Sequence, residues 1–117
     1  MKFEKIIPDS TPSYLWGNNC EARLLVSDQN LSVKLETMPP HTAEQPHYHE
    51  KARQFFFIEN GTADFEIDGI NLQVNKGEGI WIEAGTVHFI ENKNQDMLQL
   101  LVISQPDTTN DRININL

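Results

Sequence analysis

Apolar and polar residues alternate along most of this chain, from about residue 22 to residue 103, and clusters of Gly, Pro, Asn and Asp interrupt the alternation. A period of two is typical of β-strands with one buried face, whereas no segment of useful length has the helical period. The pattern therefore predicts an all-β protein.

Individual strands can be placed between the interruptions. Residues 31–36 alternate and predict a half-buried strand, which Pro39-Pro40 ends because two successive backbone donors are missing. Residues 62–67 and 70–74 alternate around Asp68-Gly69, and this pair tolerates positive φ and favours a two-residue hairpin. Further strands are expected at residues 80–83, 86–92 and 97–103.

Two segments depart from simple alternation. The sequence RQFFFIE at 53–59 is apolar on both faces, as in strands that lie between two layers. The final segment DRININL at 111–117 alternates again, so it could add an edge strand to its own sheet or across a dimer. Many short strands joined by tight turns favour a sandwich or a barrel, because both architectures remove exposed sheet edges.

The histidines carry the clearest chemical signal. His47 and His49 are two residues apart, so on a strand their imidazoles share a face with Cα atoms roughly 6.5 Å apart, which suits two ligands of one metal ion. Gln54 follows a four-residue polar connection, close enough to fold back to the same face, and barrel closure could bring His88 opposite. A single histidine is more often an ordinary surface or core residue, but the joint arrangement favours a metal site.

The spacing of these residues resembles the paired motifs of the cupin superfamily. His47, His49, Gln54 and Gly61 stand in H-x-H-x4-Q-x6-G, and Gly77, Gly85, His88 and Asn92 stand in G-x7-G-x2-H-x3-N. Of the ten positions that define the family motifs, seven match in register over residues 41–92. The departures are His41 for Gly, Gln54 for Glu and Glu83 for Pro.

The resemblance implies a small double-stranded β-helix, a jelly-roll barrel of the conserved cupin type, which agrees with the strand pattern. It also implies that His47, His49, Gln54 and His88 are the ligands of a divalent transition metal ion, with Gly61 and Gly85 in turns. Such ligands suit Zn, Mn, Fe, Ni, Co or Cu without choosing among them.

Gln54 replaces the family's carboxylate with a neutral amide oxygen. The ion should therefore be a stronger Lewis acid and be held less tightly, which favours isomerase or lyase chemistry on a sugar acid or a carbonyl compound. The ligand set resembles that of the small pectin-degradation cupin that linearises unsaturated uronates. A non-catalytic ligand-binding or sensor cupin and a metal-dependent dioxygenase are the alternatives, and the catalytic residues are not identified by the sequence.

Composition and charge narrow the expected partners. Seventeen acidic and nine basic side chains give a net charge of −8, and the basic residues form no cluster, so nucleic acid and anionic membranes are not expected as partners. The single cysteine, Cys20, is expected to be a buried residue in a reducing compartment. No signal peptide or membrane span is recognised, so a cytoplasmic protein is expected.

Several other residues have testable placements. Phe56 and Ile58 share the parity of Gln54, so they should point into the barrel, and Trp81 is expected in the core. Arg53 lies in a polar turn from which it could anchor a carboxylate, and His41 should lie on a loop outside the site. The chain of 117 residues is expected to form one domain, and a homodimer that binds a small molecule.

Overall fold

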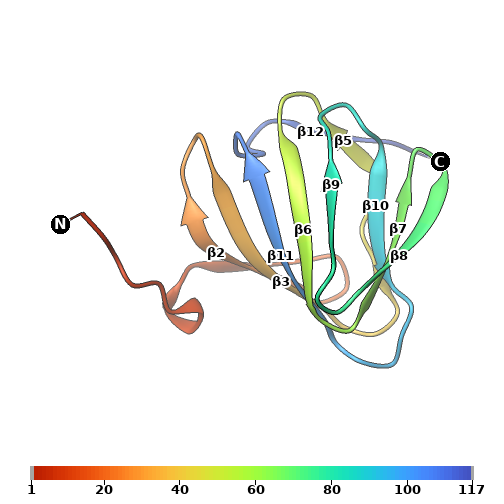
Figure 1. The fold of residues 1–117 in the computed structure, drawn as a ribbon, viewed down its shortest axis with the longest axis horizontal. Coiled ribbons are helices and arrows are strands. Elements are labelled where there is room, and N and C mark those ends of the chain that lie inside the picture. The colour runs from red at the N-terminus through yellow and green to blue at the C-terminus, as the bar shows by residue number, and fades with distance from the viewer. Residues whose placement is uncertain (1, 117) are drawn as a thin grey trace.

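The computed structural model describes residues 2–116, which form two β-sheets facing each other (Figure 1). The elements are η1 (Pro8–Ser10), β1 (Ser13–Trp16), β2 (Cys20–Ser27), β3 (Ser32–Met38), β4 (Thr42–Ala43), β5 (His47–His49), β6 (Arg53–Asn60), β7 (Thr62–Ile67), β8 (Ile70–Asn75), β9 (Gly79–Ile82), β10 (His88–Asn92), β11 (Leu98–Gln105) and β12 (Arg112–Asn114). The all-β prediction is confirmed. Within residues 2–116, no helix has the length and apolar character needed to cross a bilayer.

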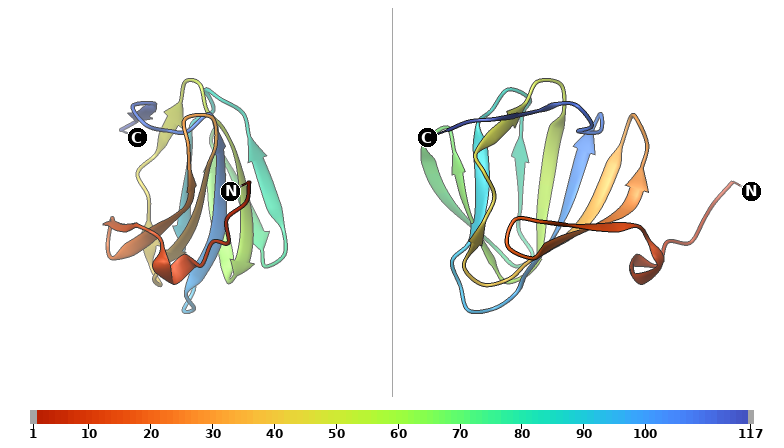
Figure 2. Two further views of the ribbon diagram at one scale, coloured as in Figure 1. Left: turned by 90° about the vertical axis from the view of Figure 1, so that its left-hand side faces the viewer. Right: turned by 180° about the vertical axis from the view of Figure 1, so that it is seen from behind.

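The strand order identifies a jelly roll. One sheet has the order β1-β2-β3-β11-β6-β9, and the other has the order β12-β5-β10-β7-β8 with β4 paired to β10. Every pair is antiparallel, and β11 lies between β3 and β6 although it follows them far along the chain. Figure 2 shows the two sheets facing each other in side and rear views. The predicted double-stranded β-helix is therefore confirmed.

The hydrophobic core lies between the two sheets. Phe56 and Ile58 from β6 point into it, as their parity predicted, with exposed fractions of 5% and 0%. The Phe56 ring meets Phe65 of β7 edge-on at a centroid distance of 5.2 Å, which joins the sheets across the interior. Cys20 is fully buried as expected. The core thus fills one end of the space between the sheets.

Strand β3 turns its polar face towards the interior. Seven residue pairs with β11 fix its register, which sets Lys34 opposite Val102 and Glu36 opposite Leu100. Val102 and Leu100 are buried at 5% and 1% exposure, so their β3 partners share the inward face. The apolar residues Val33 and Leu35 consequently lie on the outer face, opposite to what burial of the apolar residues would give.

The outer face of β6 and β9 corrects the expectation for Trp81. Its side chain is 48% exposed because Trp81 pairs with Phe55, whose parity points outward. The guanidinium of Arg53 lies over the Trp81 ring at 5.2 Å and donates to Oε1 of Gln105, so Arg53 also lies outside the interior. Among the described residues only the inner face of β6 is covered by a second sheet. The predicted homodimer stays a prediction.

The C-terminal strand adds to its own chain's sheet. β12 pairs with β5 in a register that sets Arg112 opposite His49 and Asn114 opposite His47. The edge strand predicted from the alternation therefore forms in cis, although Leu117 lies outside the described residues. This pairing brings the segment around residue 111 against the strand that carries the HxH motif.

Candidate metal centre

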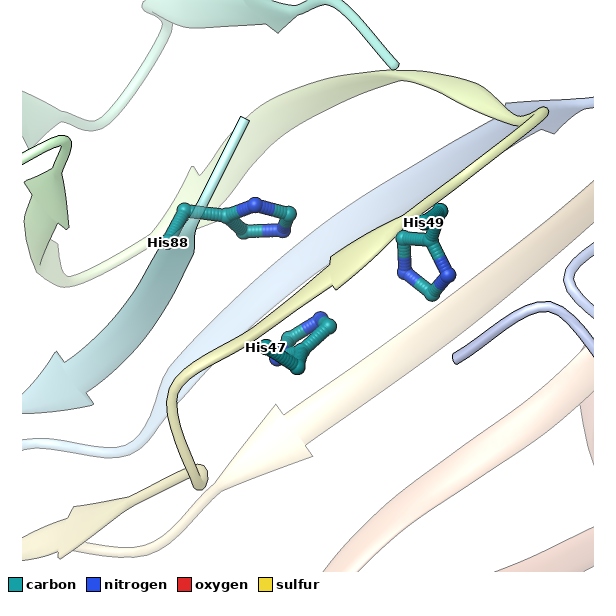
Figure 3. Close-up of side chains that lie close together, drawn as sticks. All are labelled: His47, His49 and His88. Atoms are coloured by element: carbon teal, nitrogen blue, oxygen red, sulfur yellow. The ribbon is translucent and has the colours of Figure 1, made fainter. Parts of the chain in front are cut away.

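Three buried imidazoles meet at the mouth of the space between the sheets. His47 and His49 project from β5, and His88 begins β10 directly opposite His47 (Figure 3). Their exposed fractions are 2%, 5% and 2%, and their ligand nitrogens all lie within 4.8 Å of one another. Together they are called the histidine cluster below. The prediction that the fold gathers these three residues is confirmed.

Each imidazole of the histidine cluster is held by its Nδ1 atom. The acceptors, in the order His47, His49 and His88, are the carbonyl oxygens of Gln45 at 2.8 Å, Asp111 at 2.9 Å and Thr86 at 2.8 Å. A carbonyl oxygen only accepts, so each Nδ1 carries the proton and each Nε2 keeps a free lone pair. Backbone bonds to the distal nitrogen are the arrangement that orients metal-binding histidines.

Gln54 brings an oxygen to the same cavity as His47 and His49. Its side chain is 6% exposed and its Nε2 donates to Oγ of Ser104 at 3.0 Å. Its Oε1, like Nε2 of His88, is buried without a hydrogen-bond partner among the described residues. Buried acceptors without partners are costly, and a cation bound between them would satisfy both. The donor set therefore fits a metal ion.

Burial keeps the histidine cluster neutral. Desolvation lowers the pKa of His47 to about 3 against an ordinary value of 6.5, and it also lowers the pKa values of His49 and His88. Protons therefore compete with a metal ion for these nitrogens only at a pH below the ordinary histidine value of 6.5.

Asp111 clamps the connection between the two ligand strands. Its carboxylate accepts backbone N–H groups of Glu50, Lys51 and Ala52 at 2.9 to 3.2 Å. Burial acts to raise its pKa, but these hydrogen bonds together lower it below the ordinary value. Its own carbonyl receives the Nδ1–H of His49. One residue thus fixes both a ligand ring and the turn that leads to Gln54.

Two members of the histidine cluster, His47 and His49, border a cavity of about 460 Å³ together with Gln54. The acidic and basic side chains that line the rest of the cavity are Lys34, Glu36, Glu44 and Arg112. Desolvation raises the pKa of Glu36 to about 7 and that of Glu44 to about 8. The cavity therefore combines a metal-type donor set with carboxyl groups that hold protons near neutral pH.

The remaining predicted placements can be compared with this geometry. His41 is exposed at a positive φ of 62°, outside the histidine cluster, as expected. Gly61 and Gly85 adopt φ of 85° and 82°, as turn residues do. Arg23 pairs with Glu21 at 3.3 Å and donates to the carbonyl of Pro8, and it is not among the residues lining the cavity.

Sequence reasoning missed five residues of the site. The sequence did contain a signal for Lys34 and Glu36, because they lie on the same face of the strand as Met38, which is buried. The apolar side chains on the opposite face obscured this signal, because they were the more obvious candidates for burial. The positions of Arg112 and Asp111 depend on the pairing of β12 with β5, whose register the sequence does not give. Glu44 follows a strand of only two residues and had no signal.

The metal-free protein is expected to be most stable near pH 6.5. The histidine pKa values are lower in the folded chain than their ordinary 6.5, so stability falls as the pH falls below that value. Glu36 and Glu44 have pKa values of about 7 and 8 in the folded chain against an ordinary 4.5, so their contribution to the free energy of unfolding falls as the pH rises from 4.5 to 8. Below pH 6.5 three histidines act against two carboxyl groups, and above pH 6.5 only the two carboxyl groups change the stability.

Urea unfolding of chelator-treated protein at pH 5.5, 6.5 and 8.5 measures this dependence. We expect the free energy of unfolding to be highest at the middle value, and the decrease towards pH 8.5 to disappear in a Glu36→Gln, Glu44→Gln double variant. A free energy that keeps rising to pH 8.5 in the unsubstituted protein would contradict the assignment of the raised carboxyl pKa values.

Comparisons with known proteins agree with this fold. The family model of the cupin domain matches residues 34–104 of this chain. The structure of a sugar phosphate isomerase from a cupin superfamily of Silicibacter pomeroyi is 19% identical, covers 89% of this chain and 76% of its own, and superposes with a TM-score of 0.77. The structure of KdgF from Halomonas sp. is 15% identical, covers 92% of this chain and 98% of its own, and superposes with a TM-score of 0.82.

A sequence relative is an uncharacterized protein of Aquifex aeolicus (strain VF5). It is 26% identical over 76 residues, which make up 65% of this chain. The chain spans 63% of the length of that relative. The residues matched by the cupin-domain model, 34–104, include β5 and β10, which carry the histidine cluster.

Proposed function

This chain belongs to the cupin family, and from that premise we propose that the histidine cluster and Gln54 hold a divalent transition metal ion that faces a cavity for a small oxygenated metabolite. One observation carries the proposal. Three backbone carbonyls fix the imidazoles with their Nε2 atoms free, and the buried Oε1 of Gln54 has no partner among the described residues. Fixed rings and a free oxygen acceptor are what such an ion requires.

The donor set limits the ion without naming it. Three imidazole nitrogens and an amide oxygen suit Zn, Mn, Fe, Ni, Co or Cu. When bound, the ion would supply Lewis acidity, polarising an oxygen of the ligand. All four donors are neutral, so the full charge of the ion would act on the ligand, which makes an anionic or carbonyl-bearing molecule the best fit.

The proposed reaction is isomerase or lyase chemistry on a sugar acid or a related carbonyl compound. The cavity supports this, because it carries Lys34 and Arg112 to meet a negative group and two carboxyl groups able to exchange protons near neutral pH. One structural neighbour is described as a sugar phosphate isomerase, which is in line with the same class of chemistry.

Replacing Gln54 by Glu should tighten metal binding. The carboxylate would add one negative charge at the position of the amide oxygen, and we expect roughly tenfold higher affinity, equivalent to about 1.4 kcal/mol. Competition with a chromogenic chelator, with Co²⁺ as the probe ion, measures the change. Gln54→Leu is the matched control and should bind more weakly than the unsubstituted protein. Weaker binding by Gln54→Glu would remove Gln54 from the proposed ligand set.

The function is tested by comparing metal-loaded and chelator-stripped protein. Each is incubated with uronates and sugar phosphates, and proton NMR detects isomerised or dehydrated products. Turnover that requires the ion supports the proposal. Retention of a compound without turnover would favour a non-catalytic binding protein, and oxygen uptake without isomerisation would favour a dioxygenase. Equal turnover by the stripped protein would contradict a metal-dependent reaction.

A further inference from the structure

The inner face of β3 carries polar side chains where a β-sandwich normally buries apolar ones. Lys34 and Glu36 are half-buried and line the cavity, while Val33 and Leu35 of the same strand face outward. A shift of one residue would reverse these faces, but the register with β11 excludes it. Burying charged groups costs stability, so a strand that does so beside a candidate active site is expected to serve that site.

Glu44 is a second carboxyl group in the cavity that Glu36 lines. Its side chain is 13% exposed, its Oε1 accepts the backbone N–H of Ile90 at 3.2 Å, and its Oε2 lies 4.0 Å from Nη1 of Arg112. Desolvation is the main cause of its raised pKa, and the charge of Glu36 raises it further. The two groups therefore titrate together, and with pKa values of about 7 and 8 they share about one proton between pH 7 and 8.

The charges that face this pair are few. From β3 itself, Lys34 lowers the pKa of Glu36, while its Nζ donates to the hydroxyl of Tyr14 at 3.0 Å. From β12, Arg112 lowers both values. From β2, the Cys20 thiol has a raised pKa, and the imidazoles of β5 are held neutral by burial. The positive charges of Lys34 and Arg112 thus offset part of the effect of desolvation, but both carboxyl pKa values stay above their ordinary range.

We propose that Glu36 and Glu44 are the acid–base pair of this cavity, and that their substrate is a small oxo-carboxylate with a hydroxyl group beside its carbonyl, whose acid group is met by Lys34. The carboxyl pair lines the same cavity as His47 and His49, so a ligand of a few carbon atoms can touch both. This inference rests on the proposed function for the polarised carbonyl and adds the residues that move protons.

The proton transfer balances within the pair. The ionised carboxyl takes a proton from the carbon beside the carbonyl, the C–H electrons form a C=C bond, and the carbonyl oxygen takes the proton of the neutral carboxyl. The substrate becomes an enediol and the pair again holds one proton. Reversal at the neighbouring carbon and oxygen gives the isomer. No oxidant, reductant or second substrate is needed, and the two members exchange roles as acid and base.

The titration of the pair is tested in metal-free protein labelled with ¹³C at the glutamate carboxyls. We expect two resonances with apparent pKa values of about 7 and 8. In Glu36→Gln the pKa of Glu44 should fall, because the negative charge of Glu36 no longer repels the ionised Glu44 carboxylate. The matched control is Glu59→Gln, since Glu59 is exposed and has no role in the site, and it should leave both pKa values unchanged. Two carboxyls that ionise fully below pH 5 would overturn the proposal.

Proton transfer itself is tested with pyruvate in D₂O, which loses methyl protons when the carbon beside its carbonyl is deprotonated. Metal-loaded protein should speed this exchange, and Glu36→Gln or Glu44→Gln should slow it on the order of 100-fold at unchanged metal content, whereas Glu59→Gln should not. No exchange above a metal-only blank, or full exchange in both variants, would overturn the proposal. If the unsubstituted protein binds no metal ion, that result would instead overturn the proposed function.

Discussion

His49→Ala is expected to abolish tight metal binding. Removal of groups that merely orient metal ligands already lowers affinity roughly 10- to 100-fold, so loss of a ligand nitrogen should cost at least about 100-fold. The alanine would also free the carbonyl of Asp111, which now accepts the Nδ1–H of His49. Metal content after purification and dialysis, together with a Co²⁺ titration, measures the loss. Retention of one ion per chain would remove His49 from the ligand set.

His41→Ala is the matched control for this experiment. His41 is exposed and its Nε2 contacts only the side-chain amide of Gln95, at 3.3 Å, among the contacts of the described residues. The substitution removes one imidazole from the same chain without touching the histidine cluster, so metal content should not change. Equal loss of metal in His41→Ala would indicate that the bound ion lies at a different site.

Asp111→Ala is expected to lower the free energy of unfolding by about 2 to 4 kcal/mol. The carboxylate accepts the backbone N–H groups of three successive residues. Because the N–H of Ala52 is buried, removing the carboxylate leaves this donor without a partner. Urea unfolding of the metal-free protein measures the change. Asp111→Asn should lose less, because it keeps one acceptor oxygen. A loss below about 0.5 kcal/mol would contradict the clamp.

Metal binding should weaken in the same variant. The turn held by Asp111 connects His49 to Gln54, so its release loosens the spacing of two proposed ligands. Asp96→Ala serves as the control because Asp96 is an exposed acidic residue on another loop. A stable Asp111→Ala protein with unchanged metal affinity would show that the clamp plays no part in positioning the site.

The strands and the histidine cluster could be predicted because both depend on local spacing. A period of two identifies a strand wherever it occurs, and an HxH pair on a strand must share a face. Only His88 required tertiary information, and the second motif supplied it through the resemblance to a known family. These features are confirmed at the level of strand positions, although boundaries shift by a few residues, as for β10, which begins at His88.

The orientation of strand faces could not be predicted as well. Trp81 pairs with outward-facing Phe55, and Glu36 pairs with inward-facing Leu100, so both placements follow from registers between strands far apart in sequence. A period of two gives two faces but does not say which is buried when both carry apolar side chains. The same limit hid Asp111, whose partners lie about 60 residues earlier.

One measurement tests the central claim most directly. Crystals grown with a stoichiometric amount of Co²⁺ can be measured at wavelengths on both sides of the cobalt absorption edge. The account predicts one anomalous peak within about 2.0 to 2.2 Å of Nε2 in His47, His49 and His88, with Oε1 of Gln54 beside it. A cobalt peak elsewhere on the chain, with the three Nε2 atoms left without an ion, would contradict it.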